Sequence, residues 1–171
     1  MTLQLIATGY TSVRLVSAVR RILDRNPLCS MATRSEAGVL TINAAYFAVG
    51  PGLELYFLSN PGSTHCRNLA HAGHVAVAVF DSRQEWGEPH AGLQLYGTGG
   101  PVPPGHAEQA RSLYAARFPR YFDFVMRAGE ASEGTSGFAA LRFYRFTPAR
   151  LKLLDEEEFG DEIYITADRV V

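Results

Sequence analysis

The segment that most constrains the fold runs from residue 53 to residue 80, where two apolar stretches flank a turn and a short helix. Alternating apolar residues in Leu53–Leu58 predict a half-buried strand, and Val75–Phe80 predicts a second one. Between them, Ser59–Gly62 has the composition of a turn, because proline presets one backbone dihedral and glycine permits a positive one. Residues 63–69 can then begin a helix, so the segment is predicted to be strand, turn, helix and strand.

The start of this helix is a candidate anion site. The first amides of a helix have no partner within it and lie at the positive end of its dipole, and both properties favour a phosphate. Ser63, Thr64 and His65 stand at this point, and Arg67 lies one helical turn after Ser63 on the same face. Serine and threonine are also favoured helix caps, and Arg67 suits a surface ion pair, so an ordinary capped turn remains the alternative.

The residues before this segment predict a helix and two strands. A helix is expected over about 12–24, with Val13, Val16 and Val19 on its apolar face, and Asn26 and Pro27 end it. Strands are then expected over residues 28–33 and 39–49.

The residues after Phe80 predict further strands and a helical insertion. The polar stretch that follows Phe80 carries Trp86, the only tryptophan, which is either a lid over a ligand or a packing anchor. A strand is expected over 92–99, followed by a helical insertion over about 106–127 with its second helix at Phe118–Met126. A polar link over 131–137 then leads to strands over 138–146 and 151–154. The chain is expected to continue with a solvated acidic run at Glu156–Glu158 and a strand-like segment at Glu162–Ile165.

Five or six short strands with helices at the start and after the fifth strand indicate a mainly β fold with peripheral helices. A β-barrel fits this order, although periodicity alone is equally compatible with an open α+β sheet. We expect one domain over residues 1–171, with a barrel core over about 28–154.

The composition argues against several function classes. A net charge of −1 and a pI near 6.5 lack the basic excess of nucleic-acid binders, and no apolar run approaches the roughly 20 residues that span a bilayer. We therefore expect neither nucleic acid nor membrane as a partner. Cys29 and Cys66 lack metal-type spacing, and two cysteines fit a reducing cytoplasm. His71 and His74 lack a third ligand nearby, so no metal site is expected.

The order of these pieces resembles the pyridoxamine 5′-phosphate oxidase-like family of FMN-binding split barrels. The resemblance implies a six-stranded Greek-key split β-barrel that acts as a homodimer, with one FMN at each end of the interface. It covers roughly residues 28–100 and, more loosely, Tyr114 to Leu154. The matching pieces are Cys29–Thr33, the Gly38 turn, Leu40–Phe47, Leu55–Ser59 followed by Pro61–Ser63, Arg67–Leu69, Val75–Phe80 and Gly92–Thr98.

The same resemblance implies which residues hold the cofactor. The flavin phosphate would be surrounded by the hydroxyls and cations of the strand–turn–helix segment. The backbone at Ala44 and Ala45 would lie near the flavin ring, and Gln94 would approach the ring, in many relatives from the other subunit. The implied cofactor-binding residues are Asn43, Ala44, Ala45, Leu58, Ser59, Ser63, Thr64, His65, Arg67 and Gln94.

The sequence differs from pyridoxamine phosphate oxidase proper at three places. Asn43 stands where that enzyme has a basic residue, Thr64 and His65 stand where it has an Arg-Lys pair, and Phe143–Leu154 lacks its substrate motif. We therefore expect another small acceptor, reached by hydride or electron transfer through FMN, with no catalytic acid or base named. The general-stress-type members are the nearer resemblance.

A second reading keeps the barrel and changes the ligand. The chain would then be a non-catalytic binding or sensing module for heme or a deazaflavin, with His65, His71 and His74 as candidate heme ligands. A dimeric scaffold with an empty cavity is a third reading.

Overall fold

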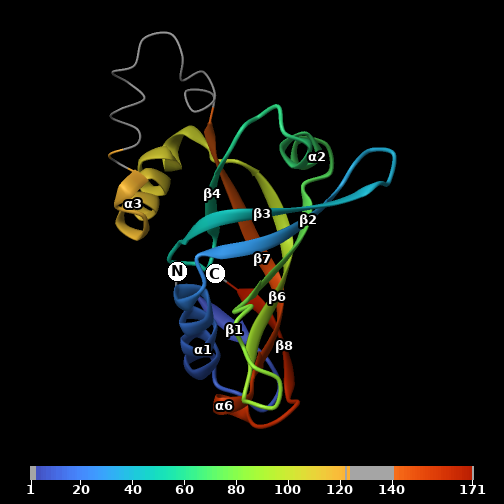
Figure 1. Ribbon diagram of the computed structural model, residues 1–171, viewed down its shortest axis with the longest axis vertical. Helices are drawn as coiled ribbons and strands as arrows, with labels where there is room; N and C mark the ends of the chain where they lie inside the picture. The colour runs from blue at the N-terminus through green and yellow to red at the C-terminus, as the bar shows by residue number, and fades with distance from the viewer. Residues whose placement is uncertain (1–2, 122, 124–140, 171) are drawn as a thin grey trace.

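The computed structural model describes residues 3–121, 123 and 141–170. These residues form eight antiparallel strands in the order β1-β8-β7-β4-β3-β2-β5-β6, and β6 also pairs with β7 (Figure 1). This last pairing closes β2 to β7 into a six-stranded barrel. The prediction of a mainly β split barrel is thereby confirmed, and the open-sheet alternative is wrong.

The strands of the described residues are β1 Gln4–Ile6, β2 Leu28–Arg34, β3 Leu40–Val49, β4 Leu55–Ser59, β5 His74–Phe80, β6 Ala91–Pro101, β7 Arg142–Asp155 and β8 Tyr164–Val170. The helices are α1 Ser12–Arg25, α2 Thr64–Ala72, α3 Ala107–Arg117 and α6 Glu156–Phe159, with a 3₁₀ turn, η1, at Pro104–His106. The expected helix at Phe118–Met126 and the link over 131–137 lie largely outside the described residues. None of the described helices is long and apolar enough to cross a bilayer.

Strand β7 organises the barrel, because one edge pairs with β6 along most of its length. Its other edge pairs first with β4 and then with β8. The sequence predicted two separate strands here, and that prediction was wrong. Pro148 is accommodated where the β6 register shifts between Tyr96 and Gly97. Gly97 is required there, since a Cβ would lie 2.0 Å from the carbonyl oxygen of Thr147.

The barrel interior is filled by alternate residues of the strands. Phe47, Phe57 and Phe146 are fully buried, and α1 adds Leu15 and other apolar side chains to the same core. Burial of this kind contributes roughly 1.5–3 kcal/mol for each large side chain. Val13 was expected on the core face of α1 but is 82% exposed, because the buried stripe of the helix begins at Leu15.

Helix α3 is attached to α1 by Arg117. Its guanidinium donates to the carbonyl oxygens of Leu23 and Asn26, each at 2.7 Å, and lies 4.6 Å from the ring centre of Phe47. Burial lowers the pKa of Arg117 from its ordinary value. The contact satisfies carbonyls that the end of α1 leaves unpaired.

The acidic run after β7 is structural rather than merely solvated, which corrects the sequence prediction. Asp155 is 3% exposed, accepts a hydrogen bond from the amide of Glu158 at 3.2 Å and pairs with Arg21 at 2.7 Å. Glu158 pairs with Arg14 at 2.7 Å and with Arg21 at 3.2 Å.

The sequence also missed β1, which pairs with β8, and it ended β8 too early, at residue 165 instead of Val170.

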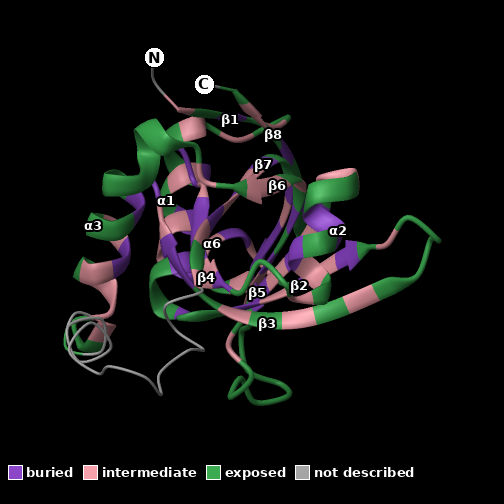
Figure 2. Ribbon diagram, turned by 90° about the horizontal axis from the view of Figure 1, so that it is seen from above, coloured by how far each residue is buried: buried purple, intermediate pink, exposed green. Residues whose placement is uncertain are grey.

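The barrel is split between β3 and β4. Strand β3 pairs with β2 over Leu40–Tyr46, but its pairing with β4 is limited to Phe47–Val49. The first seven residues of β3 therefore have one backbone edge that no strand covers in the described part of the chain. The β2–β3 hairpin projects away from the barrel on this side, and α2 lies beside it (Figures 1 and 2).

Candidate functional site

Three side chains meet where β4 ends and α2 begins. Nε2 of His65 lies 2.6 Å from Oγ of Ser59 and 3.2 Å from Oγ of Ser63, and the two hydroxyl oxygens are 3.4 Å apart. Ser59 is the last residue of β4, and Ser63 is the residue before α2. Leu58, also predicted, is half-buried beside them on β4. We call Ser59, Ser63, Thr64, His65 and Arg67 the junction cluster.

The local sequence explains why α2 starts here. Ser63 has extended backbone angles and its hydroxyl accepts from the amide of Cys66, which is the pattern of an N-cap. At the other end, Gly73 adopts a left-handed conformation with φ of 66° and donates to the carbonyl of Leu69. Cys66 and Leu69 are buried against the barrel, so the helix is fixed along its inner face.

A buried polar network fixes the orientation of α2, and sequence reasoning missed it. Nδ2 of Asn68 donates to Oγ1 of Thr33 at 3.0 Å and to Oγ1 of Thr41 at 3.1 Å, and the two threonine oxygens are 3.0 Å apart. The alternation of β2 places Thr33 on the inner face, which was the available signal. Asn68 thereby ties α2 to the strands that lead to the split.

The outer face of the first turn of α2 carries Thr64 and Arg67, both exposed. One guanidinium nitrogen of Arg67 donates to the carbonyl of Gly62, and the other lies 3.2 Å from Oγ1 of Thr64. These contacts hold the positive charge next to the amides at the helix start. The junction therefore combines a cation, hydroxyls and helix N-terminal amides, which is the chemistry of an anion site.

His65 contributes to the junction as a hydrogen-bonding ring more than as a charge. Burial lowers the pKa of His65 from its ordinary value of 6.5, so the neutral imidazole dominates at pH 7. A neutral ring has one donor and one acceptor nitrogen, so Nε2 can either donate a hydrogen bond to the hydroxyl of Ser59 or Ser63 or accept one from it. The sequence analysis had considered His65 as a phosphate neighbour or a heme ligand, and the contacts with the two serine hydroxyls add a third role.

The uncovered edge of β3 carries the other predicted residues. Ala44 points to the outer face and is exposed, whereas Asn43 and Ala45 are half-buried on the inner side. Oδ1 of Asn43 is a buried side-chain oxygen that no described group meets with a hydrogen bond. Because such an atom costs roughly 1–3 kcal/mol, it suits a donor supplied by a ligand.

Gln94 lies apart from the junction cluster within one chain. It is an exposed residue of β6 whose Oε1 accepts from the hydroxyl of Tyr96 at 2.8 Å. The ladder register places Ala44, Ser30, Ala78 and Gln94 in one row across four strands. Three strand spacings amount to roughly 14 Å, so Gln94 lies well away from the β3 edge within one chain.

Comparison with known proteins identifies the family. A sequence model described as pyridoxamine 5′-phosphate oxidase matches residues 15–155, which include the junction cluster and the whole barrel. The chain belongs to the pyridoxamine 5′-phosphate oxidase family. No curated protein matches it significantly in sequence.

Solved structures share the family fold at low sequence identity. An FAD-binding protein from Mesorhizobium loti has a TM-score of 0.59 and 16% identity, covering 100% of both chains. A general stress protein 26-related protein from Clostridium acetobutylicum, of the pyridoxinephosphate oxidase family, has a TM-score of 0.60 and 16% identity, covering 91% of this chain and 93% of the other. A heme-binding protein from Mycobacterium smegmatis has a TM-score of 0.67 and 14% identity, covering 88% of this chain and 56% of the other.

Trp86, the aromatic side chains around Tyr114 and the possible metal ligands lie outside the junction cluster. Trp86 is fully exposed, so it is not a packing anchor within the chain. Tyr114 packs on Phe118 and Tyr121 at ring distances of 4.8 and 5.1 Å, and burial raises the pKa of Tyr114 to about 12. No group of three or more metal-ligating side chains occurs among the described residues.

Proposed function

We propose that the protein binds FMN at the junction cluster and acts as an FMN-dependent oxidoreductase. The observation that carries this proposal is the convergence of Ser59, Ser63 and His65 beside the uncovered edge of β3. An anion site next to a free strand edge suits a ligand with a phosphate at one end and a flat hydrogen-bonding ring at the other.

The junction cluster fits a phosphate dianion. Such a group only accepts hydrogen bonds, and the hydroxyls, the α2 amides and the Arg67 guanidinium all donate. A hydrogen bond to a charged group contributes about 1.5–3 kcal/mol. Phosphate would also favour protonation of His65, which would then add a second cation.

The β3 edge fits the flavin ring. Backbone groups on the uncovered side of Leu40–Tyr46 offer donors and acceptors, and Oδ1 of Asn43 offers a buried acceptor for an N–H or O–H. The flavin supplies the hydride and electron chemistry when bound. The protein's own residues would orient the ring and exclude water from one side of it.

We also propose that two copies form the working unit. Large apolar side chains stand exposed on the outer face of the barrel around β2, β3, β5 and β6, which is a property of interfaces more than of free surfaces. They are Leu28, Leu40, Ile42, Tyr46, Phe80 and Tyr96. A second copy over this face would bring its Gln94 toward the β3 edge, which one chain cannot do.

Free buried thiols at Cys29 and Cys66 support a reducing cytoplasm as the location.

Heme is the second candidate ligand, supported by the heme-binding relative from Mycobacterium smegmatis. The neutral ring of His65 has the protonation state of an axial ligand, but its Nε2 is already engaged by Ser59 and Ser63. His71 is exposed in the last turn of α2, and His74 is exposed at the start of β5. This geometry favours FMN, because a phosphate uses the hydroxyls that heme would leave unused.

The absorption spectrum of the freshly purified protein, followed by FMN and heme titrations in parallel, tests the proposal. We expect flavin bands that persist through gel filtration, or saturable FMN binding that quenches flavin fluorescence. A protein that stays colourless after FMN addition contradicts the proposal. A Soret band on heme addition that His65→Ala abolishes would establish the second candidate instead.

A further inference from the structure

A small hollow lies between the end of α1, the loop that joins β5 to β6, and the start of α6. Its volume is about 200 Å³, below the roughly 300–1,000 Å³ of sites for drug-sized molecules, so a ligand that fits it is small. Ile22, Pro89 and Ala91 give the hollow an apolar part, and the rest of its lining is polar or charged.

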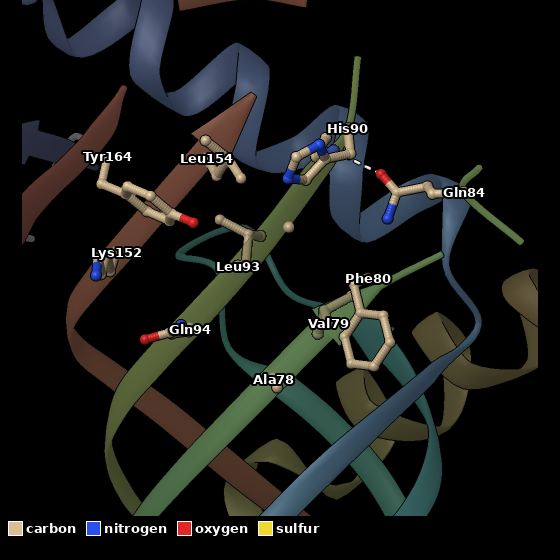
Figure 3. Close-up of a pocket in the computed structure, with 12 residues that line it drawn as sticks. Ala78, Val79, Phe80, Gln84, His90, Leu93, Gln94, Lys152, Leu154 and Tyr164 are labelled. Atoms are coloured by element: carbon tan, nitrogen blue, oxygen red, sulfur yellow. Dashed lines mark hydrogen bonds between the residues drawn. The ribbon is translucent and has the colours of Figure 1, made fainter. Parts of the chain in front are cut away.

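This hollow is separate from the proposed flavin site. None of its lining residues belongs to the junction cluster, to the uncovered β3 edge or to the apolar side chains proposed for the interface with a second copy, and Gln94 does not line it. It shares Gln84, His90 and Ala91 with the neighbouring hollow on the outer face of the barrel, which is drawn in Figure 3. In that view Gln84 and His90 lie at the edge of the neighbouring hollow, away from Gln94 (Figure 3).

Two of the carboxylates around the small hollow already have cationic partners. Asp155 pairs with Arg21 at 2.7 Å, and Asp81 pairs with Arg83 at 3.0 Å. Gln84 is fixed as well, since its side chain donates to the carbonyl of Asp81 at 2.9 Å. These groups shape the hollow and do not need a ligand.

One cation and three acceptors of the lining have no partner among the described residues. The cation is the guanidinium of Arg25, the last residue of α1, and one acceptor is the carboxylate of Glu157. A second acceptor is Oδ1 of the buried Asn26, whose Nδ2 alone is bonded, to a carbonyl of α1 at 2.8 Å. The third is Nε2 of His90, because Nδ1 lies 2.9 Å from a Glu156 oxygen and so carries the proton of the neutral ring.

We propose that this hollow binds a small apolar α-amino acid of about the size of alanine. Its carboxylate would pair with Arg25, and its ammonium group would donate its three N–H bonds to Asn26, His90 and Glu157. The methyl group would lie on the apolar part of the lining. A cation at the end of a helix is favourable without a ligand, so Arg25 alone makes no site. One free cation together with three free acceptors is what matches a zwitterion.

Titration of the isotope-labelled protein with L-alanine, followed by amide chemical shifts and without added FMN, tests the site. We expect saturable shifts around Ile22, Ala91 and Glu157, with a dissociation constant in the millimolar range because the charged partners are exposed to water. Propionate lacks the ammonium group, and L-alaninamide lacks the carboxylate. Each should bind at least about tenfold more weakly, since a charge-assisted hydrogen bond is lost.

Two exposed side chains allow the contacts to be removed without disturbing the core. Arg25→Met should make L-alanine and L-alaninamide bind alike, and Glu157→Gln should weaken L-alanine and leave propionate unchanged. Arg34→Met and Glu88→Gln are the matched controls, because each removes an exposed charge of the same sign that does not line the hollow. Neither control should change a titration.

Three results would overturn this inference. These are the absence of saturable shifts with L-alanine, equal affinity for L-alanine, propionate and L-alaninamide, and shifts that Arg25→Met and Glu157→Gln both leave unchanged. Each is read without FMN, so this proposal and the proposed flavin function fail separately.

Discussion

The two ends of the barrel differ in how completely their polar groups are paired. At the closed end, β7 pairs on both edges, and Asp155, Arg21 and Glu158 satisfy one another beneath α1. At the split end, no strand in the described part of the chain pairs with the edge of β3 over residues 40–46, and no described group donates to Oδ1 of Asn43. Ser59, Ser63 and His65 there have hydrogen-bond contacts with one another. The closed end stabilises the fold, whereas the split end keeps the polar groups on which the proposed ligand site depends.

This difference teaches where to expect function in such a barrel. Buried or half-buried polar groups without hydrogen-bond partners lower the stability of the fold. We therefore expect them mainly where a ligand supplies the missing hydrogen bond. Changes at the closed end should therefore alter unfolding and spare binding, and changes at the split end should do the reverse.

Arg21→Met should cause the largest loss of unfolding free energy. It leaves the buried Asp155 carboxylate with little more than the Glu158 amide, and breaking such a pair costs about 3 kcal/mol. Urea denaturation should show this loss, with FMN affinity of the folded protein unchanged. Arg14→Met removes an exposed partner of Glu158 and a cation–π contact with the ring of Phe159, 4.7 Å away, and should cost only about 1 kcal/mol. Equal losses of unfolding free energy in the two variants would contradict the claim that the buried Arg21–Asp155 pair stabilises the closed end.

The double variant Thr64→Ala with Arg67→Ala should act in the opposite way. It removes a hydroxyl and the fixed cation of the junction cluster, so FMN should bind at least about 100-fold more weakly, since two charge-assisted bonds of about 1.5–3 kcal/mol each are lost. Both side chains are exposed, so the unfolding free energy should change by less than about 1 kcal/mol. Fluorescence titration measures the first quantity. Arg83→Ala, which loses only its pairing with Asp81, is the control and should bind FMN normally.

Asn68→Ala should lower both the unfolding free energy and the affinity for FMN. The change removes the amide that holds α2 against Thr33 and Thr41, and it leaves their buried hydroxyls with only each other. We expect about 1–2 kcal/mol of lost stability and a smaller loss of FMN affinity, because α2 positions the junction cluster. Hydrogen exchange of the α2 amides should rise in the variant. Unchanged exchange would show that α2 is held by its apolar face alone.

The smallest effect concerns pH. Because burial lowers the pKa of His65 below 6.5, the unfolded chain binds a proton more readily than the folded protein. This contribution to stability is complete above pH 6.5 and declines as the pH falls below 6.5 toward the folded pKa. His65→Asn should flatten that part of the stability profile by a few tenths of a kcal/mol, since the ring is only half-buried. Bound FMN should reverse the slope, because phosphate favours the protonated ring.

The barrel and most of its strands could be predicted from the sequence, because alternation and turn residues are local signals. The junction cluster was also predictable, since Ser59 to Arg67 are close in sequence. Contacts between distant segments were not, as with Arg21 and Asp155 or Asn68 and Thr33. The continuity of β7 depended on a register shift opposite Tyr96 and Gly97 of β6, which leaves Ala149 of β7 out of the ladder and which no local pattern at Pro148 reveals.

The most direct test of the central claim compares FMN with riboflavin, which has the same ring and no phosphate. If the split end binds the flavin through its phosphate, FMN should bind about a hundredfold more tightly, as two charge-assisted bonds of about 1.5 kcal/mol each require. The Thr64→Ala and Arg67→Ala double variant should bring the two affinities together. Equal affinities for FMN and riboflavin in the unaltered protein would contradict the account.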